Sequence, residues 1–250
     1  PACDGPIDWK DREAVQNDIS NFKAASSGVI AHFLLNQYFP TREAYLAQLA
    51  DVMKQEYNAI HQAGFLLQID CPDLAMARHL MFSDISNQDF VKIAEANVEV
   101  LNHALSDIPP DDIRMHLFGG IMGPHHRNIP MKEIVGTVLK ARPQAFSFEA
   151  ANPRHEHEWE VFKNVKLPDG KIIIPGVLDS TTNYIELPKL IAQRIVRYAE
   201  LEGKENVIAG SDCGFGTFAR TNYKVDPEIV WAKFKAMSEG AHLASEQLWG

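Results

Sequence analysis

The chain has 250 residues, which is enough for one domain with a sizeable hydrophobic core. Its 46% hydrophobic and 23% charged content excludes an intrinsically disordered chain, and no stretch approaches the roughly 20 apolar residues that a membrane-spanning helix needs. The 24 Lys and Arg against 33 Asp and Glu give a net charge of −9, which argues against a nucleic-acid partner.

The cysteines indicate a reducing compartment. Cys3, Cys71 and Cys213 are odd in number and far apart, which argues against a disulfide framework. The chain begins at Pro1 with no charged, apolar and small-residue leader. We therefore expect a cytoplasmic protein.

Short apolar runs alternate with amphipathic stretches along the chain. Each run has the length of a strand that is buried on both faces. In chain order, the runs predict strands at Ala2–Ile7, Val29–Leu35, Phe65–Ile69, Ile113–Phe118, Ala145–Phe148, Ile172–Leu178 and Val207–Ala209.

The stretches between these runs carry helix signals. Apolar residues at the helical period predict a helix over Tyr45–Ala63 that buries one face against a sheet. Gly64 and Gly203 stand where glycines end helices. Asp226 and Pro227 predict the N-cap and first residue of the last helix.

Counted in order, the elements make seven strand-then-helix units with no linker between them, so we expect one continuous α/β domain over residues 1–250. Apolar strands of this kind form parallel sheets, either doubly wound or closed into a (β/α)8 barrel. No Gly-x-Gly-x-x-Gly follows any predicted strand, which disfavours the dinucleotide-binding fold. The sequence therefore predicts a TIM (β/α)8-type barrel that is one unit short.

Polar residues recur at or just after the predicted strands. Each of them alone is more simply a cap or turn former, but a barrel collects catalytic groups at the C-terminal ends of its strands. His, Glu and Cys are also the residue types that bind zinc. The candidates are Asn36, Asp70, His116, Glu149, Asp179, Asp212 and Cys213.

Four longer strings carry a family resemblance over essentially the whole chain. In order, they are LLQIDCPDLAM (Leu66–Met76), FSFEAANPRHEHEW (Phe146–Trp159), IPGVLDSTTNYIE (Ile174–Glu186) and VIAGSDCGFGTFA (Val207–Ala219). These strings resemble the short, single-barrel relatives of the cobalamin-independent methionine synthase catalytic domain, a group that includes enzymes like epoxyalkane:coenzyme M transferase.

The resemblance implies a TIM barrel that lacks the first βα unit at the N-terminus. It also implies a zinc ion that binds a substrate thiol as thiolate for methyl or alkyl transfer. By position, it implies the metal ligands His116, Glu149 and Cys213. Relatives place a cysteine ligand two residues after the metal histidine, where this chain has Phe118. Three protein ligands and an open position suit a catalytic zinc, but the lost thiolate predicts weaker binding.

The resemblance also implies roles around the substrates. Asp70 matches an aspartate near the substrate amino group, and Asn36 is a second substrate-binding candidate. Asp179 lies on the loop where methionine synthases place an acid that assists the leaving group. The family's histidine on that loop aligns with Thr181, which leaves Asp179 as the candidate catalytic residue.

Substitute metal ligands are less favoured. His125 and His126 are more simply surface loop residues, and Cys71 is more simply a small buried residue. The acidic and basic alternation of His155–Glu158 lies at an apparent helix start, where neighbours point in different directions, so we interpret it as supporting or surface residues.

Two other functions stay open. One is a metal-independent lyase or hydrolase that uses Asp70, Asp179 and Glu149 as acid and base. The other is a non-catalytic relative with a degenerate zinc site. The expected partners are a small-molecule thiol with a methyl or alkyl donor, such as homocysteine with a methylated folate or coenzyme M with an epoxide. A homo-oligomer would cover the strand edges of an open barrel.

Overall fold

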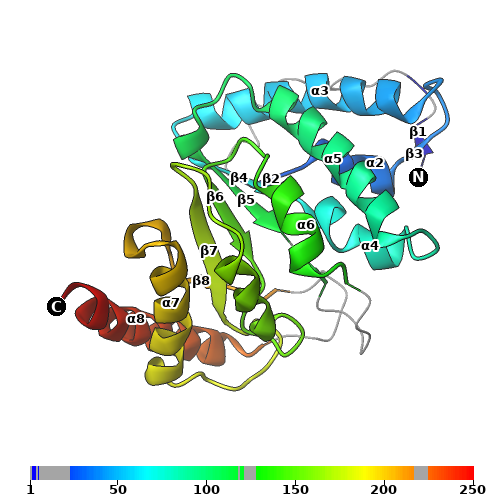
Figure 1. Cartoon of the computed structure of the whole chain (residues 1–250). Helices are drawn as coiled ribbons and strands as arrows, with labels where there is room; N and C mark the ends of the chain where they lie inside the picture. The colour runs from blue at the N-terminus through cyan, green and yellow to red at the C-terminus, as the bar shows by residue number, and fades with distance from the viewer. Residues whose placement is uncertain (1, 4, 6–22, 118, 121–127, 217–224) are drawn as a thin grey trace. The chain divides into compact units, whose positions relative to one another are not determined.

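The computed structural model describes residues 2–3, 5, 23–117, 119–120, 128–216 and 225–250. Parallel strands are followed by helices along the chain (Figure 1). Within this part of the chain, no helix is long and apolar enough to cross a membrane. The chain divides into two compact units, the first made of residues 1–120 and 127–145 and the second of residues 121–126 and 146–250.

The first unit has two parallel sheets. Its strands β2, β4 and β5 pair in that order, and β1 pairs with β3. Helices α2, α3 and α5 pack on one another (Figure 1). The elements are β1 (Ala2–Cys3), β2 (Lys23–Ala25), α2 (Ser27–Phe33), β3 (Leu35–Asn36), α3 (Arg42–Gln62), β4 (Leu67–Asp70), η1 (Pro72–Leu74), α4 (Ala77–Leu80), α5 (Asn87–Ala104), η2 (Pro110–Asp112), β5 (Ile113–Leu117) and α6 (Met131–Val138).

The prediction of a strand over Val29–Leu35 is wrong, because most of this run lies in helix α2. Ser26 caps the helix by accepting a hydrogen bond from the Val29 amide at 3.1 Å. A short apolar run fits a buried helix as well as a buried strand, so hydrophobicity alone does not separate the two. Strand β2 lies just before this run in the chain.

The helix expected over Tyr45–Ala63 is confirmed as α3, shifted by a few residues at its start. Thr41 caps it by accepting a hydrogen bond from the Ala44 amide at 3.1 Å. Its apolar stripe is buried, and the Tyr57 hydroxyl donates to the Ala25 carbonyl at 2.6 Å. This bond ties the helix to strand β2.

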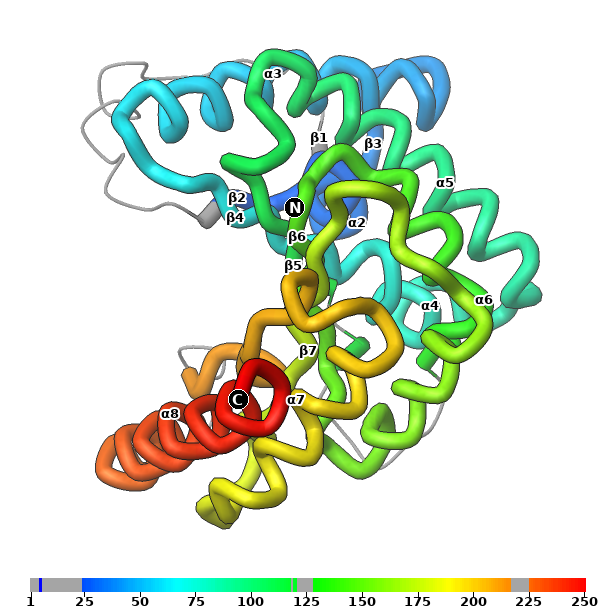
Figure 2. Tube along the Cα trace, turned by 60° about the vertical axis from the view of Figure 1, so that its left-hand side comes forward, coloured from blue at the N-terminus to red at the C-terminus, as the bar shows by residue number. Residues whose placement is uncertain are grey.

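The second unit contains strands β6, β7 and β8, which are neighbours in that order. Helices α7 and α8 lie side by side in both views (Figures 1 and 2). The elements are β6 (Ala145–Phe148), η3 (Glu156–Lys163), β7 (Ile172–Leu178), α7 (Pro188–Glu202), η4 (Lys204–Asn206), β8 (Gly210–Ser211) and α8 (Pro227–Trp249).

Two predicted strands of the second unit are confirmed with their bounds, Ala145–Phe148 and Ile172–Leu178. The strand expected over Val207–Ala209 begins directly after these residues, as β8. Within the predicted range, Val207 makes an isolated bridge to Ile173. The β7–β8 register shifts between Gly176 and Leu178, which displaces the regular pairing toward the carboxyl end.

The predicted helix ends are confirmed. Gly64 follows the C-cap residue of α3 and has a φ of 86°. Gly203 is itself the C-cap residue of α7 and has a φ of 90°. The Asp226 side chain accepts from the Glu228 amide at 2.8 Å, and Pro227 is the first residue of α8.

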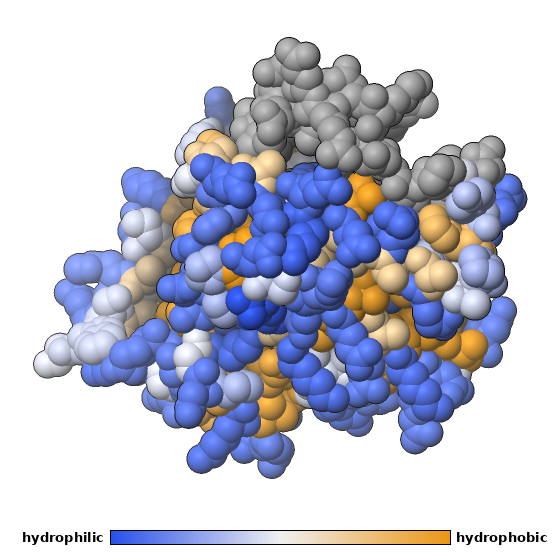
Figure 3. Space-filling view, turned by 90° about the horizontal axis from the view of Figure 1, so that it is seen from above, coloured by the Kyte–Doolittle hydropathy of each residue, from blue (hydrophilic) through white to orange (hydrophobic). Residues whose placement is uncertain are grey.

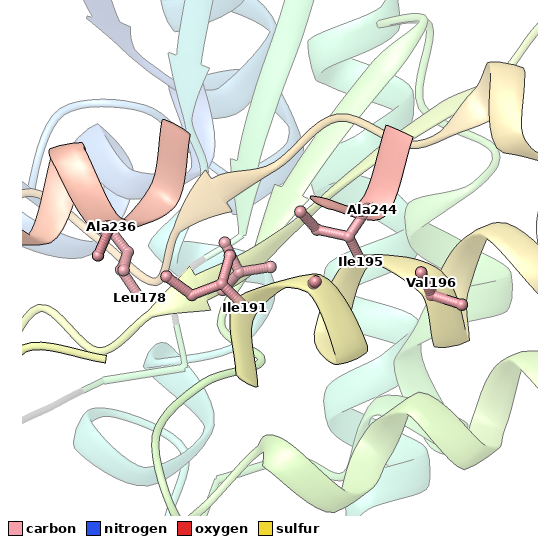
Figure 4. Packing of buried hydrophobic residues seen from close by; sticks show 8 residues of the cluster. Leu178, Ile191, Ile195, Val196, Ala236 and Ala244 are labelled. Carbon is pink, nitrogen blue, oxygen red and sulfur yellow. The ribbon is translucent and has the colours of Figure 1, made fainter. Parts of the chain in front are cut away.

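The core of the second unit lies between β7, α7 and α8. Figure 4 shows Leu178 of β7 with Ile191 and Ile195 of α7 and Ala236 and Ala244 of α8. All five are buried, so burial of apolar surface fixes α8 against α7 and the end of β7.

The surface view in Figure 3 shows hydrophilic residues over most of the face drawn, with smaller hydrophobic groups between them. A hydrophilic surface agrees with the interpretation of the acidic excess as ordinary solvated surface charge.

Candidate functional site

In the first unit, two predicted site residues lie together. Asp70 ends β4 and is the direct neighbour of His116 on the parallel strand β5. His116 Nδ1 lies 3.2 Å from Asp70 Oδ1, and the His116 carbonyl accepts from the Cys71 amide at 2.9 Å. His116 is buried. A carboxylate on one ring nitrogen of a histidine fixes the ring so that the other nitrogen is directed toward a ligand.

Asp73 forms a buried polar network that the sequence reasoning did not single out. It accepts hydrogen bonds from the Ser26 hydroxyl at 2.5 Å and the Asn97 amide at 3.0 Å, and Arg42 donates to Asn97 at 3.0 Å. Burial raises the pKa of Asp73 to about 6. The available signal was its position three residues after Asp70 in the same family string.

His32 lies beside this network, against a cavity of about 10 Å³ that Asp73 also lines. Desolvation lowers the pKa of His32 to about 4, so its ring is neutral at pH 7. In the part of the chain that the structure covers, neither ring nitrogen of His32 has a hydrogen-bond partner. Its ring contacts Phe82 edge to face at 5.3 Å between centroids.

Asn36 uses its side chain within its own loop. Its Oδ1 accepts from the Tyr38 and Phe39 amides at 3.2 and 2.8 Å, and its Nδ2 donates to the Phe39 carbonyl at 2.9 Å. Asn36 ends the two-residue strand β3, which pairs with β1 in a separate sheet, so it does not follow a strand over Val29–Leu35 as predicted.

In the second unit, Asp212 holds the loop that follows Glu149. Its carboxylate accepts from the Ala150, Ala151 and Asn152 backbone amides, each at 2.8 Å, and from Asn152 Nδ2 at 2.9 Å. Asp212 is fully buried, and burial raises the pKa of its carboxyl while these amide donors oppose the change. Four donors converge on one carboxylate, which places Glu149 at a fixed loop position.

Glu149 also lies beside a buried histidine. His155 Nε2 is 3.5 Å from Glu149 Oε2, and His155 Nδ1 is 2.7 Å from Glu158 Oε2. Burial alone would lower the pKa of His155, but the Glu158 hydrogen bond and the Glu149 charge raise it above its ordinary value. His155 and Glu158 are buried, so the surface interpretation does not hold for these two residues, whereas His157 is exposed.

Asp179 follows β7 and is buried. Its Oδ1 accepts from the Thr181 amide at 2.8 Å and the Thr181 hydroxyl at 2.6 Å. Its own amide donates to Glu186 Oε1 at 2.8 Å. Thr181, which aligns with the family's histidine, therefore binds the candidate acid.

The two described thiols differ. Cys213 is half-buried next to Asp212, and its carbonyl accepts from the Ser211 hydroxyl at 2.9 Å. Cys71 is fully buried, and desolvation raises its pKa well above the usual value. Burial therefore disfavours a thiolate at Cys71.

His116 belongs to the first unit, whereas Glu149 and Cys213 belong to the second. Over the residues that the structure describes, no group of three or more His, Cys, Asp or Glu side chains is arranged to hold a metal ion. Phe118, His125 and His126 lie outside those residues. The donor chemistry of imidazole, carboxylate and thiol still fits zinc, and the partners of His116 and Glu149 are of the kind that orient metal ligands.

Comparisons with known proteins give the family. Residues 34–230 match the cobalamin-independent synthase, catalytic domain, and no curated protein matches the chain. A solved B12-independent methionine synthase from Shewanella sp. W3-18-1, in complex with selenomethionine, has a TM-score of 0.70 and 17% sequence identity, covering 98% of this chain and 70% of that chain. This likeness confirms the expected α/β, TIM-barrel-like fold class. Because the family match spans most of the sequence, the chain belongs to the cobalamin-independent synthase catalytic domain family.

Proposed function

We propose that the chain is a zinc-dependent transferase that moves a methyl or alkyl group onto a small-molecule thiol. The observation that carries the proposal is the Asp70–His116 pair at the ends of two neighbouring parallel strands, 3.2 Å apart. Membership of a methionine-synthase-like family supports transferase chemistry. With Nδ1 held by Asp70, the His116 ring would present Nε2 to the metal.

Three residues would hold the metal: His116, Glu149 and Cys213. When bound, zinc would lower the pKa of the substrate thiol so that the nucleophile exists at neutral pH. Glu149 would be held in place by the Asp212 loop and by His155. The bond to Asp70 orients His116, and the family resemblance implies that Asp70 would also lie near the amino group of the substrate.

Asp179 would act on the donor side of the reaction. The new bond joins the thiol sulfur to the transferred carbon, and the bond from that carbon to nitrogen or oxygen of the donor breaks. The thiol releases one proton when it becomes the nucleophile and the leaving atom takes one up. Asp179 would transfer this proton through Oδ2, because both Thr181 bonds go to Oδ1. Homocysteine with a methylated folate and coenzyme M with an epoxide both satisfy this balance, and we keep Asn36 as a second substrate-binding candidate.

Metal content and activity test the proposal. Purified, zinc-replete protein should hold a single zinc ion per chain. Cys213→Ser should lose most of it, and Cys71→Ala, the matched cysteine change, should retain it. Thiol alkylation would be followed with homocysteine and coenzyme M, using 5-methyltetrahydrofolate and epoxypropane as donors. Zinc-free wild-type protein after metal loading, or unchanged zinc content in Cys213→Ser, would overturn the zinc-thiolate mechanism.

A second candidate is a metal-independent lyase or hydrolase that uses the strand-end carboxylates Asp70, Asp179 and Glu149 as acid and base. The two candidates differ in their response to a strong chelator. Full activity after chelation and removal of free metal would support the second one.

We also propose that residues 1–250 act as one domain in a reducing, cytoplasmic compartment. The odd number and wide spacing of Cys3, Cys71 and Cys213 in the sequence support a reducing environment. Limited proteolysis would test the single domain, because a stable fragment ending near residue 145 would contradict it.

A further inference from the structure

Lys233 of helix α8 is completely buried, which is rare for a lysine. Its ammonium lies 2.8 Å from Glu186 Oε2, and the Glu186 side chain is only 8% exposed. Replacing a buried ion pair by apolar residues is often neutral for stability, so such a pair is weak evidence of a stabilising role. Its position in the unit suggests another purpose.

Glu186 divides its two oxygens between two partners. Oε2 binds Lys233, and Oε1 accepts the backbone amide of Asp179 at 2.8 Å. The lysine on the last helix is therefore connected through a single carboxylate to the main chain of the candidate acid. Both ends of this connection lie within the second unit.

The loop between β7 and α7 needs an anchor of this kind. Tyr184 and Leu187 on this loop are 82% and 72% exposed, so apolar packing of these side chains does not hold it. Helix α8, in contrast, is packed against α7 and β7 through the cluster in Figure 4. Lys233 thus joins an exposed loop to a well-packed helix.

We propose that Lys233 is a positioning residue for Asp179, acting through Glu186. The proposal rests on the proposed role of Asp179 as the acid for the leaving group. The Lys233–Glu186 pair fixes the Asp179 amide, the Thr181 bonds fix Oδ1, and Oδ2 is then presented to the leaving atom. A misplacement of about 1 Å at a catalytic group can lower a rate by about 100-fold.

The kinetic experiment uses the full chain with zinc and compares Lys233→Met with Lys235→Met. Lys235 lies two residues further along the same helix with its side chain 80% exposed, which makes it a matched control. With homocysteine or coenzyme M and a donor that needs protonation, Lys233→Met should lower kcat by about 10- to 100-fold with KM within about twofold of wild type. Lys235→Met should behave as wild type.

A second donor separates positioning from a general structural defect. Methyl iodide needs no proton on its leaving group, so Lys233→Met and Asp179→Asn should both alkylate the thiol at the wild-type rate with it. If Lys233→Met is impaired equally with both kinds of donor, the residue has only a structural role and the proposal is overturned.

A double substitution tests whether Lys233 works through Glu186. Lys233→Met alone leaves a buried carboxylate, and Glu186→Gln alone leaves a buried ammonium. The double variant has neither charge, and the Gln carbonyl can still accept the Asp179 amide. Its kcat should therefore be several-fold higher than that of either single variant. A loss of kcat equal to the product of the two single losses would show two independent effects and overturn the connection through Glu186.

Amide hydrogen exchange gives a readout that does not depend on activity. The Asp179 amide should exchange at least about tenfold faster in Lys233→Met than in Lys235→Met, because its acceptor is no longer held. Equal exchange would overturn the positioning role even in an inactive protein. Faster exchange in Lys233→Met, found together with a wild-type chain that alkylates no thiol, would instead support the connection and contradict the proposed function.

Discussion

The carboxylate of Asp212 occupies the space that a side chain at Gly176 would need. A Cβ at residue 176 would overlap Asp212 Oδ1 and would lie 2.8 Å from the Asp212 backbone nitrogen and Cα. The glycine of β7 therefore allows the carboxylate to reach the Ala150–Asn152 amides, and so it helps to fix the loop that carries Glu149.

Gly176→Ala should destabilise the protein by about 1–3 kcal/mol, because backbone atoms of Asp212 cannot move aside as a flexible side chain would. Urea unfolding measures the change. Gly136→Ala is the control, since residue 136 lies in helix α6 with open space around it, and this change should raise stability by up to about 1 kcal/mol. A Gly176→Ala protein as stable as wild type would contradict the packing described.

Asp212→Asn should lower the free energy of unfolding by about 1–3 kcal/mol and reduce zinc binding. An asparagine keeps one acceptor oxygen, but its NH₂ group faces an amide that formerly donated to the carboxylate, so one buried donor is left unmatched. Thermal unfolding and zinc content measure the two effects. The exposed Asp169→Asn is the matched change in the same unit and should alter neither. Wild-type zinc content in Asp212→Asn would show that zinc binding does not depend on the hold of Asp212 on the Glu149 loop.

His32 should make the protein sensitive to acid. Its pKa is about 4 in the folded chain and 6.5 in the unfolded reference, so the unfolded state binds the proton first as pH falls. Stability is full above pH 6.5 and decreases down to about pH 4, with a loss of about 2 kcal/mol between pH 7 and pH 5.

His32→Phe keeps a ring against Phe82 and removes this loss. Asp73 acts in the opposite direction, because its raised pKa lowers stability as pH rises from 3.8 to about 6. That contribution is present in both proteins and cancels when their unfolding curves at pH 7 and pH 5 are compared. Equal acid losses in wild type and His32→Phe would show that His32 is accessible to protons in the folded chain.

Asp70→Asn should weaken zinc binding by about 10- to 100-fold while the protein stays folded, because the amide orients the His116 ring less well than the carboxylate. Competition with a chromophoric chelator measures the affinity. Asp51→Asn is the matched control: Asp51 pairs with His103 at 2.9 Å on the exposed surface and should leave zinc binding unchanged. Unaltered affinity in Asp70→Asn would argue against His116 as a ligand.

Local signals in the sequence predicted much of the fold. The strands β6 and β7 are continuous apolar runs between polar segments, and the Asp226–Pro227 pair begins α8 as expected. The run Val29–Leu35 was predicted wrongly because its apolar content suits both a strand and a buried helix, and only its packing in the first unit selects the helix.

By itself, the sequence determined the family, the alternation of strands and helices, and the strand-end neighbours Asp70 and His116, since these follow from motif order and from the shared edge of parallel strands. Only the tertiary structure decided which residues support them. Asp212 reaches the Glu149 loop, and Lys233 reaches Asp179 through Glu186, across separations of about sixty and fifty residues. Such contacts have no local pattern, because they depend on how close the folded backbone brings distant elements.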